Sequence, residues 1–467
     1  MSVTSSASDS LSPGLKSRHI RMLSIAGVIG AGLFVGSGHA IAEAGPAVLI
    51  AYIIAGGLVV LIMRMLAEMA VSTPDSGSFS TYAHNALGRW AGFTIGWLYW
   101  WFWVLVIPLE ANAAATILNS WFPQVAIWQF TLVITLLLTA SNLFSVKHYG
   151  EFEFWLALVK VVAIVAFLVL GCVAIFGLMP GSQVSGMSHL YDTGGFMPHG
   201  FGAVLAAILT TMFSFMGTEI VTIAAAESKN PGREISRATN SVIWRISLFY
   251  LLSILFIVSL VPWNTPALAK NGSYQTVLEL MNIPHARLIV DIVVLTAVCS
   301  CLNSALYTSS RMLYSLATRK DAPAAAAKTN KGGTPWVAVL SSTAAAFLAV
   351  FANYFAPAEV FDFLLASSGA IALLVYLVIS CSHLVMRKRM EARGEALDYR
   401  MWLFPGLTYA VIVVIVGILC SMLFMPAHRS EIIATGILAL LVVLAGLVIH
   451  RRQRNNRSHS SLQENGI

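Results

Sequence analysis

The most regular pattern in the chain is a series of long apolar segments separated by short polar ones. Each segment holds roughly 20 or more residues with almost no charge, the length at which a helix crosses a bilayer. Alternating segments of about ten residues, typical of a membrane β-barrel, are absent from the sequence. The pattern predicts an all-α polytopic membrane protein with twelve transmembrane helices, at residues 22–43, 46–70, 92–118, 126–144, 153–177, 201–226, 240–262, 287–316, 335–355, 359–384, 403–424 and 431–450.

The distribution of positive charge predicts how these helices are oriented. Only 10% of the residues are charged, against about 25% in soluble proteins. Lys and Arg gather in alternate connections, whereas the opposite connections carry only Lys270, Arg429 and, at a helix mouth, Arg287. Cytoplasmic loops accumulate Lys and Arg, so we expect both termini in the cytoplasm, which requires an even number of spans. The net charge of +7 is then a signal of topology and not a nucleic-acid surface.

The same pattern divides the chain into four parts. Residues 1–20 are expected to form a disordered cytoplasmic N-terminal tail, which lacks the basic start and apolar run of a signal peptide. Residues 21–400 form the transporter core, with helices one to ten. Residues 401–450 form the last two helices, and 451–467 form a cytoplasmic C-terminal tail.

The first apolar segment contains the glycine-rich stretch SIAGVIGAGLFVG, residues 24–36. It is not a phosphate loop, because a Walker motif needs Lys and Ser or Thr after its last glycine. Two interpretations remain: close helix packing through small residues, or a break in the helix. Each glycine costs a helix about 1 kcal/mol relative to alanine, and irregular backbone at membrane depth must line a cavity or be buried in protein. We favour the broken helix, as in transporters that bind carboxylates at such breaks.

A second irregular stretch lies in the sixth span, where Gly217 and the ionisable Glu219 interrupt the apolar sequence. Spans one and six correspond if the first five spans repeat in spans six to ten. Paired interruptions at corresponding positions are a sequence indicator of a transporter site. The pattern therefore predicts discontinuous helices one and six.

Ionisable residues inside apolar spans are functional candidates. Lys160 either extends its ammonium to the membrane surface or faces the broken part of the first span, where gain and loss of a proton would couple transport to the proton gradient. Glu110 and Glu219 are each either buried structural carboxylates or part of the transport site. Arg64 and Glu68, four residues apart, are expected to form a structural pair on one helix face.

No pattern in the sequence indicates an enzyme, a cofactor or a metal. The motifs G-x-S-x-G and H-E-x-x-H are absent, and the His and Cys residues lack ligand spacing. A channel would need a ring of polar or charged residues along one pore, which the sequence does not show. A nutrient receptor would need a signalling domain, which the short tails do not offer.

Several segments in register resemble one family. The segments are SIAGVIGAGLFVGSGHAIAEAGP, RMLAEMAV, GEFEFWLALVK, FSFMGTEIVTIAAAESKNP followed by ISRA, and SRMLYSLA. They are similar to the amino-acid transporters of the amino acid–polyamine–organocation superfamily, from residue 14 to about residue 457. Within that superfamily the pattern looks most like the bacterial 4-aminobutyrate (GABA) permeases.

The resemblance implies a LeuT-like fold, with two inverted repeats of five helices plus two extra helices. It also implies proton-coupled import of GABA and related ω-amino acids across the bacterial inner membrane. The alternative within the family is an importer or exchanger of another amino acid, such as β-alanine, proline or an aromatic amino acid.

The resemblance also assigns roles to individual residues. The substrate carboxylate is expected on the amides of Gly30, Ala31 and Gly32, and Ala31 replaces a serine found in many relatives. The carbonyls of Val28 and of the region around Phe213 and Met216 are expected to face the amine, with Glu110 as a further candidate. Lys160 matches the proton-coupling lysine of the family, and Asn303 and Ser304 are possible neighbours of the coupling site. Glu219 is a second candidate for proton coupling because it adjoins the second interruption.

Overall fold

The computed structural model describes residues 16–23, 29–75, 77–144, 146–226, 228, 230–330, 332–355, 357–426 and 429–464. Throughout these residues the regular structure is helical, and no strand occurs in them. The α-helices are α1 (Ser17–Met22), α2 (Ser37–Ala44), α3 (Val48–Ser72), α4 (Ser78–Leu87), α5 (Arg89–Trp121), α6 (Ile127–Phe144), α7 (Val146–Ile175), α8 (Gly200–Phe215), α9 (Ile220–Ala226), α10 (Pro231–Arg245), α11 (Ser253–Leu260), α12 (Pro266–Asn271), α13 (Ser273–Leu280), α14 (Ala286–Thr318), α15 (Trp336–Phe355), α16 (Pro357–Ala392), α17 (Gly406–Leu423) and α18 (Arg429–Glu464).

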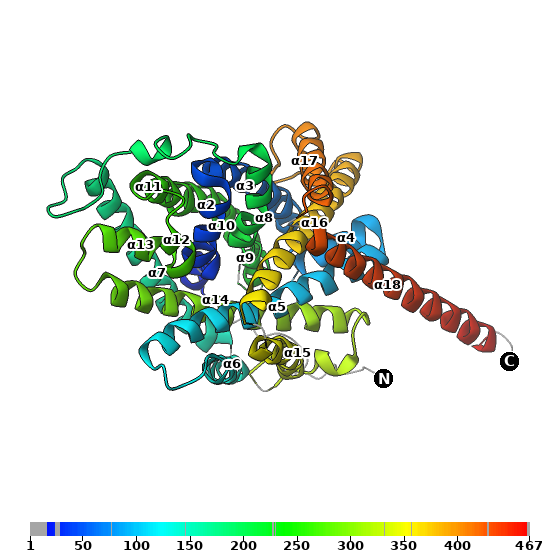
Figure 1. Ribbon diagram of the computed structural model, residues 1–467. Coiled ribbons are helices and arrows are strands. Elements are labelled where there is room, and N and C mark those ends of the chain that lie inside the picture. The colour runs from blue at the N-terminus through cyan, green and yellow to red at the C-terminus, as the bar shows by residue number, and fades with distance from the viewer. Residues whose placement is uncertain are drawn as a thin grey trace.

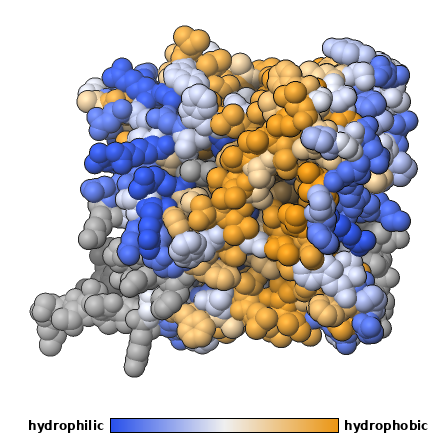
Figure 2. Space-filling view, turned by 90° about the vertical axis from the view of Figure 1, so that its left-hand side faces the viewer, coloured by the Kyte–Doolittle hydropathy of each residue, from blue (hydrophilic) through white to orange (hydrophobic). Residues whose placement is uncertain are grey.

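The described helices have the length and surface of membrane spans. Ten segments among the described residues are long and apolar enough to cross a bilayer, and α15 contains a shorter apolar run, Trp336–Phe347. One of the ten, Gly32–Ser72, includes parts of both the first and the second predicted span. Figure 2 shows a band of hydrophobic surface between two hydrophilic margins. The molecule is therefore a multi-pass membrane protein.

Short π-helical and 3-10 segments complete the helical order. The π-helical segment η2 (Gly32–Gly36) leads into α2, and η5 (Ile246–Leu252) joins α10 to α11. The 3-10 segments are η3 (Gly45–Ala47), η4 (Ser188–Leu190) and η6 (Ala324–Ala327). The predicted N-terminal tail ends earlier than residue 20, because α1 already begins at Ser17 and its side chain donates a hydrogen bond to Glu234.

The helices that position the candidate site lie in the middle of the bundle (Figure 1). α5 packs along α14, and Gly96 allows this close approach because a Cβ there would lie 2.7 Å from a methyl carbon of Leu316. α8 packs between α2, α3 and α16. By contrast, α17 and α18 present many exposed apolar side chains. The core is therefore formed by α2, α3, α5, α8, α14 and α16, and it surrounds the two glycine-containing stretches.

Candidate functional site

The first glycine-rich stretch is not helical where the described chain resumes. Ile29 and Gly30 are irregular, and η2 begins at Gly32. The Ala31 amide donates hydrogen bonds to both carboxylate oxygens of Glu110, at 3.2 and 3.0 Å. The Ile29 carbonyl accepts a hydrogen bond of 2.9 Å from the Lys160 ammonium. Side chains from α5 and α7 thus satisfy two backbone groups that a continuous helix would pair internally.

Both charged partners of this first break are deeply buried. Glu110 is 1% exposed and Lys160 is 0% exposed. The Lys160 side chain therefore turns to the interior, and the alternative in which it reaches the membrane surface is wrong. Charged groups are costly to bury unless they are hydrogen-bonded and paired, so the irregular backbone and the two side chains stabilise one another.

Glycine is required at this break because other helices approach it closely. A Cβ on Gly30 would lie 2.5 Å from a Glu110 oxygen and 2.7 Å from the Cys301 Cβ. A Cβ on Gly32 would lie 2.9 Å from the Ser214 Cα and 3.1 Å from the Phe213 ring. The glycines thus let the first span meet α5, α8 and α14 at van der Waals distance.

A small cavity adjoins the break. Its space for the centre of a water molecule is only about 10 Å³, room for about one water. An amino acid does not fit unless side chains move, and the Phe213 and Phe102 rings, with centroids 6.4 Å apart, line the space. The lining residues are Gly32, Phe102, Trp103, Val106, Glu110, Phe213, Ser214, Met216 and Cys301.

The second interruption lies between α8 and α9. Gly217 has a φ of +98°, a conformation that favours glycine, and its amide donates to the Glu219 carboxylate at 3.0 Å. The Tyr99 hydroxyl donates to the same carboxylate at 2.9 Å and the Tyr376 hydroxyl at 3.4 Å. Thr218 accepts a hydrogen bond from the buried Arg245. The backbone amide freed at this break is thus satisfied by the Glu219 carboxylate of the same loop, and we describe the break as closed by its own loop.

The structure brings together most of the residues predicted for the site. Gly30, Ala31, Gly32, Glu110 and Lys160 meet at the first break, and Phe213 and Met216 line its cavity. Glu219 belongs to the second break. Val28 lies outside the described residues.

Asn303 and Ser304 lie on another part of α14, facing α6 and α7. Asn303 accepts a hydrogen bond of 2.7 Å from the Asn142 amide, and the Ser304 and Tyr149 hydroxyls are 3.2 Å apart. Sequence reasoning missed the group that these residues surround. It is Glu153, which is buried and accepts a hydrogen bond from Ser300. Its position seven residues before Lys160, on the same helix face, was the available signal.

A much larger cavity lies at the α12–α13 end of the molecule, with a volume of about 480 Å³. We call this cavity the vestibule. Phe34 lines the vestibule and Gly32 lines the small cavity, so η2 lies between the two spaces. Lys270, in the last turn of α12, belongs to a connection between spans that the charge pattern predicts to be outside the cytoplasm. The other lining residues include Val35, His39, Asn112, Thr116, Gln275 and Asp291.

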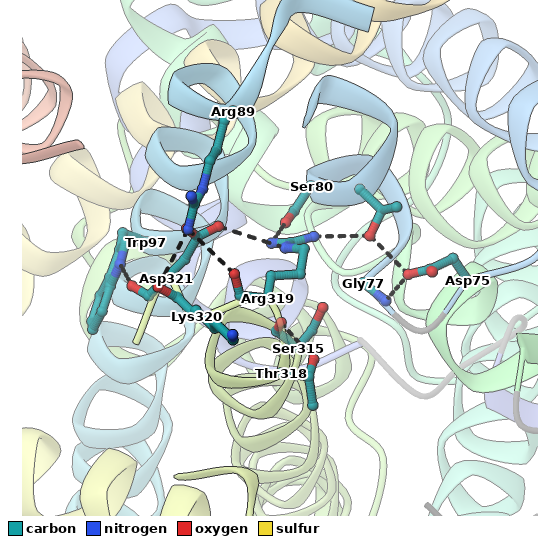
Figure 3. Close-up of polar contacts among 11 residues, drawn as sticks. Asp75, Gly77, Ser80, Arg89, Trp97, Ser315, Thr318, Arg319, Lys320 and Asp321 are labelled. Carbon is teal, nitrogen blue, oxygen red and sulfur yellow. Dashed lines mark hydrogen bonds and ion pairs between the residues drawn. The ribbon is translucent and has the colours of Figure 1, made fainter. Parts of the chain in front are cut away.

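A polar cluster, which we call the Arg319 cluster, lies at the end of the molecule opposite the vestibule (Figure 3). Arg319, after α14, donates to Thr81 at 2.8 Å and also to Ser80, both on α4. Asp321 forms an ion pair of 2.9 Å with Arg89 at the start of α5. These contacts join α4, α5 and the end of α14. The two arginines belong to the connections predicted to be cytoplasmic.

The expected pair between Arg64 and Glu68 does not form. Arg64 instead donates to the Tyr399 hydroxyl at 3.0 Å and to the Arg400 carbonyl at 2.8 Å. Glu68 is paired with Arg387 at 2.9 Å. Partners from α16 and the following loop replace the intrahelical pair. An i,i+4 ion pair on a helix surface stabilises by only a few tenths of a kcal/mol. A buried carboxylate gains more from the charge-assisted contact with Arg387, which helix packing brings to it.

Comparisons with known proteins agree with this architecture. A family model described as amino acid permease matches residues 19–461. The chain is 66% identical over 445 residues to a probable GABA permease of Pseudomonas aeruginosa, covering 95% of this chain and 94% of the relative. It is 68% identical over 439 residues to a gamma-aminobutyric acid permease of Escherichia coli (strain K12), covering 94% of each. A crystal structure of a manganese transporter from Eremococcus coleocola matches with a TM-score of 0.55 at 15% identity, over 92% of both chains, which indicates a shared fold.

Proposed function

Because this chain belongs to the amino acid permease family, we propose that it is a proton-coupled symporter that imports 4-aminobutyrate and related ω-amino acids across the bacterial inner membrane. Two relatives above 60% identity, over nearly the full chain, carry GABA permease names. The observation that carries the mechanism is the hydrogen bonding of the Ala31 amide to a carboxylate, that of Glu110.

The first break is suited to hold the substrate carboxylate. Backbone N–H groups freed from a helix, together with the partial positive charge of a helix N-terminus, bind carboxylates. In the described form the Ala31 amide already donates its hydrogen bond to the Glu110 carboxylate. Substrate binding therefore requires that Glu110 moves away from the Ala31 amide. It also requires that Phe213 moves, because the cavity holds only about one water.

The Lys160 ammonium is the proposed carrier of the coupling proton. It holds the Ile29 carbonyl, and a charge-assisted hydrogen bond is roughly twice as strong as a neutral one. Loss of the proton weakens the link between α7 and the first break. The proton gradient thereby biases the conformation of the site, with no other cofactor.

We propose twelve spans, with both termini in the cytoplasm and a 5+5 inverted repeat followed by two further helices. Support for this arrangement comes from the irregular stretches before η2 and between α8 and α9, which belong to the first and sixth predicted spans. In this arrangement the vestibule faces outward and the Arg319 cluster closes the cytoplasmic side. Transport then requires that the cluster opens while η2 seals the vestibule.

The direct test is uptake of radiolabelled GABA by proteoliposomes, with and without an imposed inward proton gradient. We expect accumulation only with the gradient, with competition by ω-amino acids such as β-alanine and little competition by proline or phenylalanine. Accumulation of an α-amino acid instead would keep the carboxylate site and overturn the substrate. GABA exchange that no proton gradient influences would overturn the coupling.

A further inference from the structure

Glu153 is a buried acidic group that the substrate site does not use. It lies on α7, is 1% exposed, and precedes Lys160 by seven residues. Seven residues are about two helical turns, or roughly 10 Å along the axis, on one face. Long helical side chains extend toward the N-terminus of their helix, so that of Lys160 extends toward Glu153.

Hydrogen bonds connect Glu153 to neighbouring helices. Ser300 on α14 donates to one carboxylate oxygen, and the Asn303 amide lies 3.5 Å from the other. Asn303 in turn accepts from the Asn142 amide on α6 at 2.7 Å. An ionised carboxylate can only accept hydrogen bonds, and these neighbours all offer donors. Glu153 is thus held in a position where it can exist as a carboxylate and receive a proton.

A surface cavity lies beyond this polar cluster. Its volume is about 440 Å³, which is large enough for several waters at about 30 Å³ each. Asn303 both lines the cavity and contacts Glu153, while Phe144 and Phe152 on the rim are exposed. The cavity lies where α6 meets α7, the same end as Arg18 of α1, which bonds to Glu151. The charge pattern predicts that this end is cytoplasmic.

We propose that Glu153 is the proton-release site of the transporter, passing the coupling proton from Lys160 to water in the α6–α7 cavity. The proposal rests on the symport function proposed above. In the transfer, an N–H bond of the Lys160 ammonium breaks and an O–H bond forms on Glu153, which leaves both groups neutral. Water in the cavity then accepts the proton from Glu153 and restores its carboxylate.

Charged and polar groups from several helices surround the two partners of this transfer. Glu110 and Lys160 both contact the first break, and Glu153 precedes Lys160 by about two turns of α7. α14 places the Cys301 thiol near Lys160 and hydroxyls and an amide near Glu153. α6 contributes the Asn142 amide and the Ser141 hydroxyl, both through Asn303, and Arg18 and His19 of α1 engage Glu151 instead. Lys160 thus contacts the first break, and Glu153 adjoins the cavity through Asn303.

The test separates proton transfer from substrate movement in proteoliposomes. Counterflow of radiolabelled GABA at equal pH on both sides needs substrate movement but no net proton transfer. Accumulation driven by a pH gradient, with a pH-sensitive dye in the lumen, reports both. The variants are Glu153→Gln, which keeps the shape and most hydrogen bonds, and Glu395→Gln as control, since Glu395 forms an exposed pair with Arg393.

We expect Glu153→Gln to keep counterflow within twofold of wild type and to lose at least tenfold in gradient-driven accumulation, with no GABA-dependent proton signal. The control should match wild type in both assays, and Glu153→Asp should restore at least a third of the accumulation. Accumulation at the control level in Glu153→Gln would overturn the relay. Equal loss of counterflow and accumulation in a folded protein would also overturn it, because Glu153 would then serve binding or packing.

A second variant covers failure of Glu153→Gln to fold. Asn303→Leu leaves Lys160 and Glu153 in place and removes the amide between the carboxylate and the cavity. We expect at least threefold slower gradient-driven accumulation with unchanged counterflow, and an unchanged rate would contradict the relay. Absence of gradient-driven accumulation in the wild type would instead overturn the symport function itself, so the two failures are distinguishable.

Discussion

The two helix breaks solve the same backbone problem in different ways. At the first break, the Ala31 amide and the Ile29 carbonyl are satisfied by Glu110 and Lys160, which come from two other helices. At the second, the Gly217 amide is satisfied by Glu219, two residues away in the same loop. Tyr99 and Tyr376 then hold the carboxylate.

The difference indicates which break changes during transport. A break whose partners belong to other helices changes its hydrogen bonds whenever those helices shift or one partner loses its charge. A break closed by its own loop can move as a unit while its bonds remain. We therefore propose that substrate and proton coupling belong to the first break and that Glu219 is a fixed structural carboxylate.

The largest expected effect comes from filling the first break. Gly32→Leu should abolish GABA binding, because its Cβ would already lie 2.9 Å from the Ser214 backbone. Gly57→Leu is the matched control, since a Cβ on Gly57 meets no atom within 4 Å. Binding is measured by scintillation proximity on purified protein. Wild-type affinity in Gly32→Leu would contradict the broken-helix site.

Removal of the charge on Lys160 should have the next largest effect. Lys160→Met keeps an apolar stem of similar length but no longer holds the Ile29 carbonyl, so gradient-driven accumulation should fall at least tenfold. Surface expression and retention on size exclusion should stay near wild type. Accumulation that still follows the imposed pH gradient would show that the coupling proton is held elsewhere.

A change at the second break should affect stability more than coupling. In Glu219→Gln the amide oxygen still accepts from Gly217, but its NH₂ group cannot accept from a tyrosine hydroxyl. A buried donor left unsatisfied costs about 1–3 kcal/mol, so the melting temperature should fall while the ratio of protons to GABA stays constant. A lost proton signal at normal stability would restore Glu219 as a proton-coupling residue, the role that its position in the sequence suggests.

The smallest effect is expected at the edge of the second break. The Tyr376 hydroxyl makes the longest of the hydrogen bonds described for Glu219, 3.4 Å, and a typical hydrogen bond contributes about 0.5–1.5 kcal/mol. Tyr376→Phe should lower the melting temperature by less than Glu219→Gln and leave uptake near wild type. A larger stability loss than in Glu219→Gln would contradict the closure of this break by its own carboxylate.

The sequence predicted the residues of the first break better than their partnerships. Glycine clusters and lone charges in apolar spans are local features, so Gly30, Gly32, Lys160 and Glu110 were identifiable without a structure. The contact of Glu110 with the Ala31 amide was not, because 79 residues separate the two groups. Glu153 was overlooked for a similar reason, since its importance depends on Ser300 and Asn303 of α14.

By itself the sequence determined the class of protein, the approximate positions of the spans and the places where two of them are interrupted, because hydropathy and glycine content act over short distances along the chain. Only the tertiary structure decided which charged side chain forms a hydrogen bond with which backbone group. Packing of α5 and α7 against the first break gave its amide and carbonyl partners from afar, while the second break took Glu219 from its own loop. Tertiary packing also gave Arg64 and Glu68 different partners, because buried charged groups pair with the side chains that neighbouring elements place beside them.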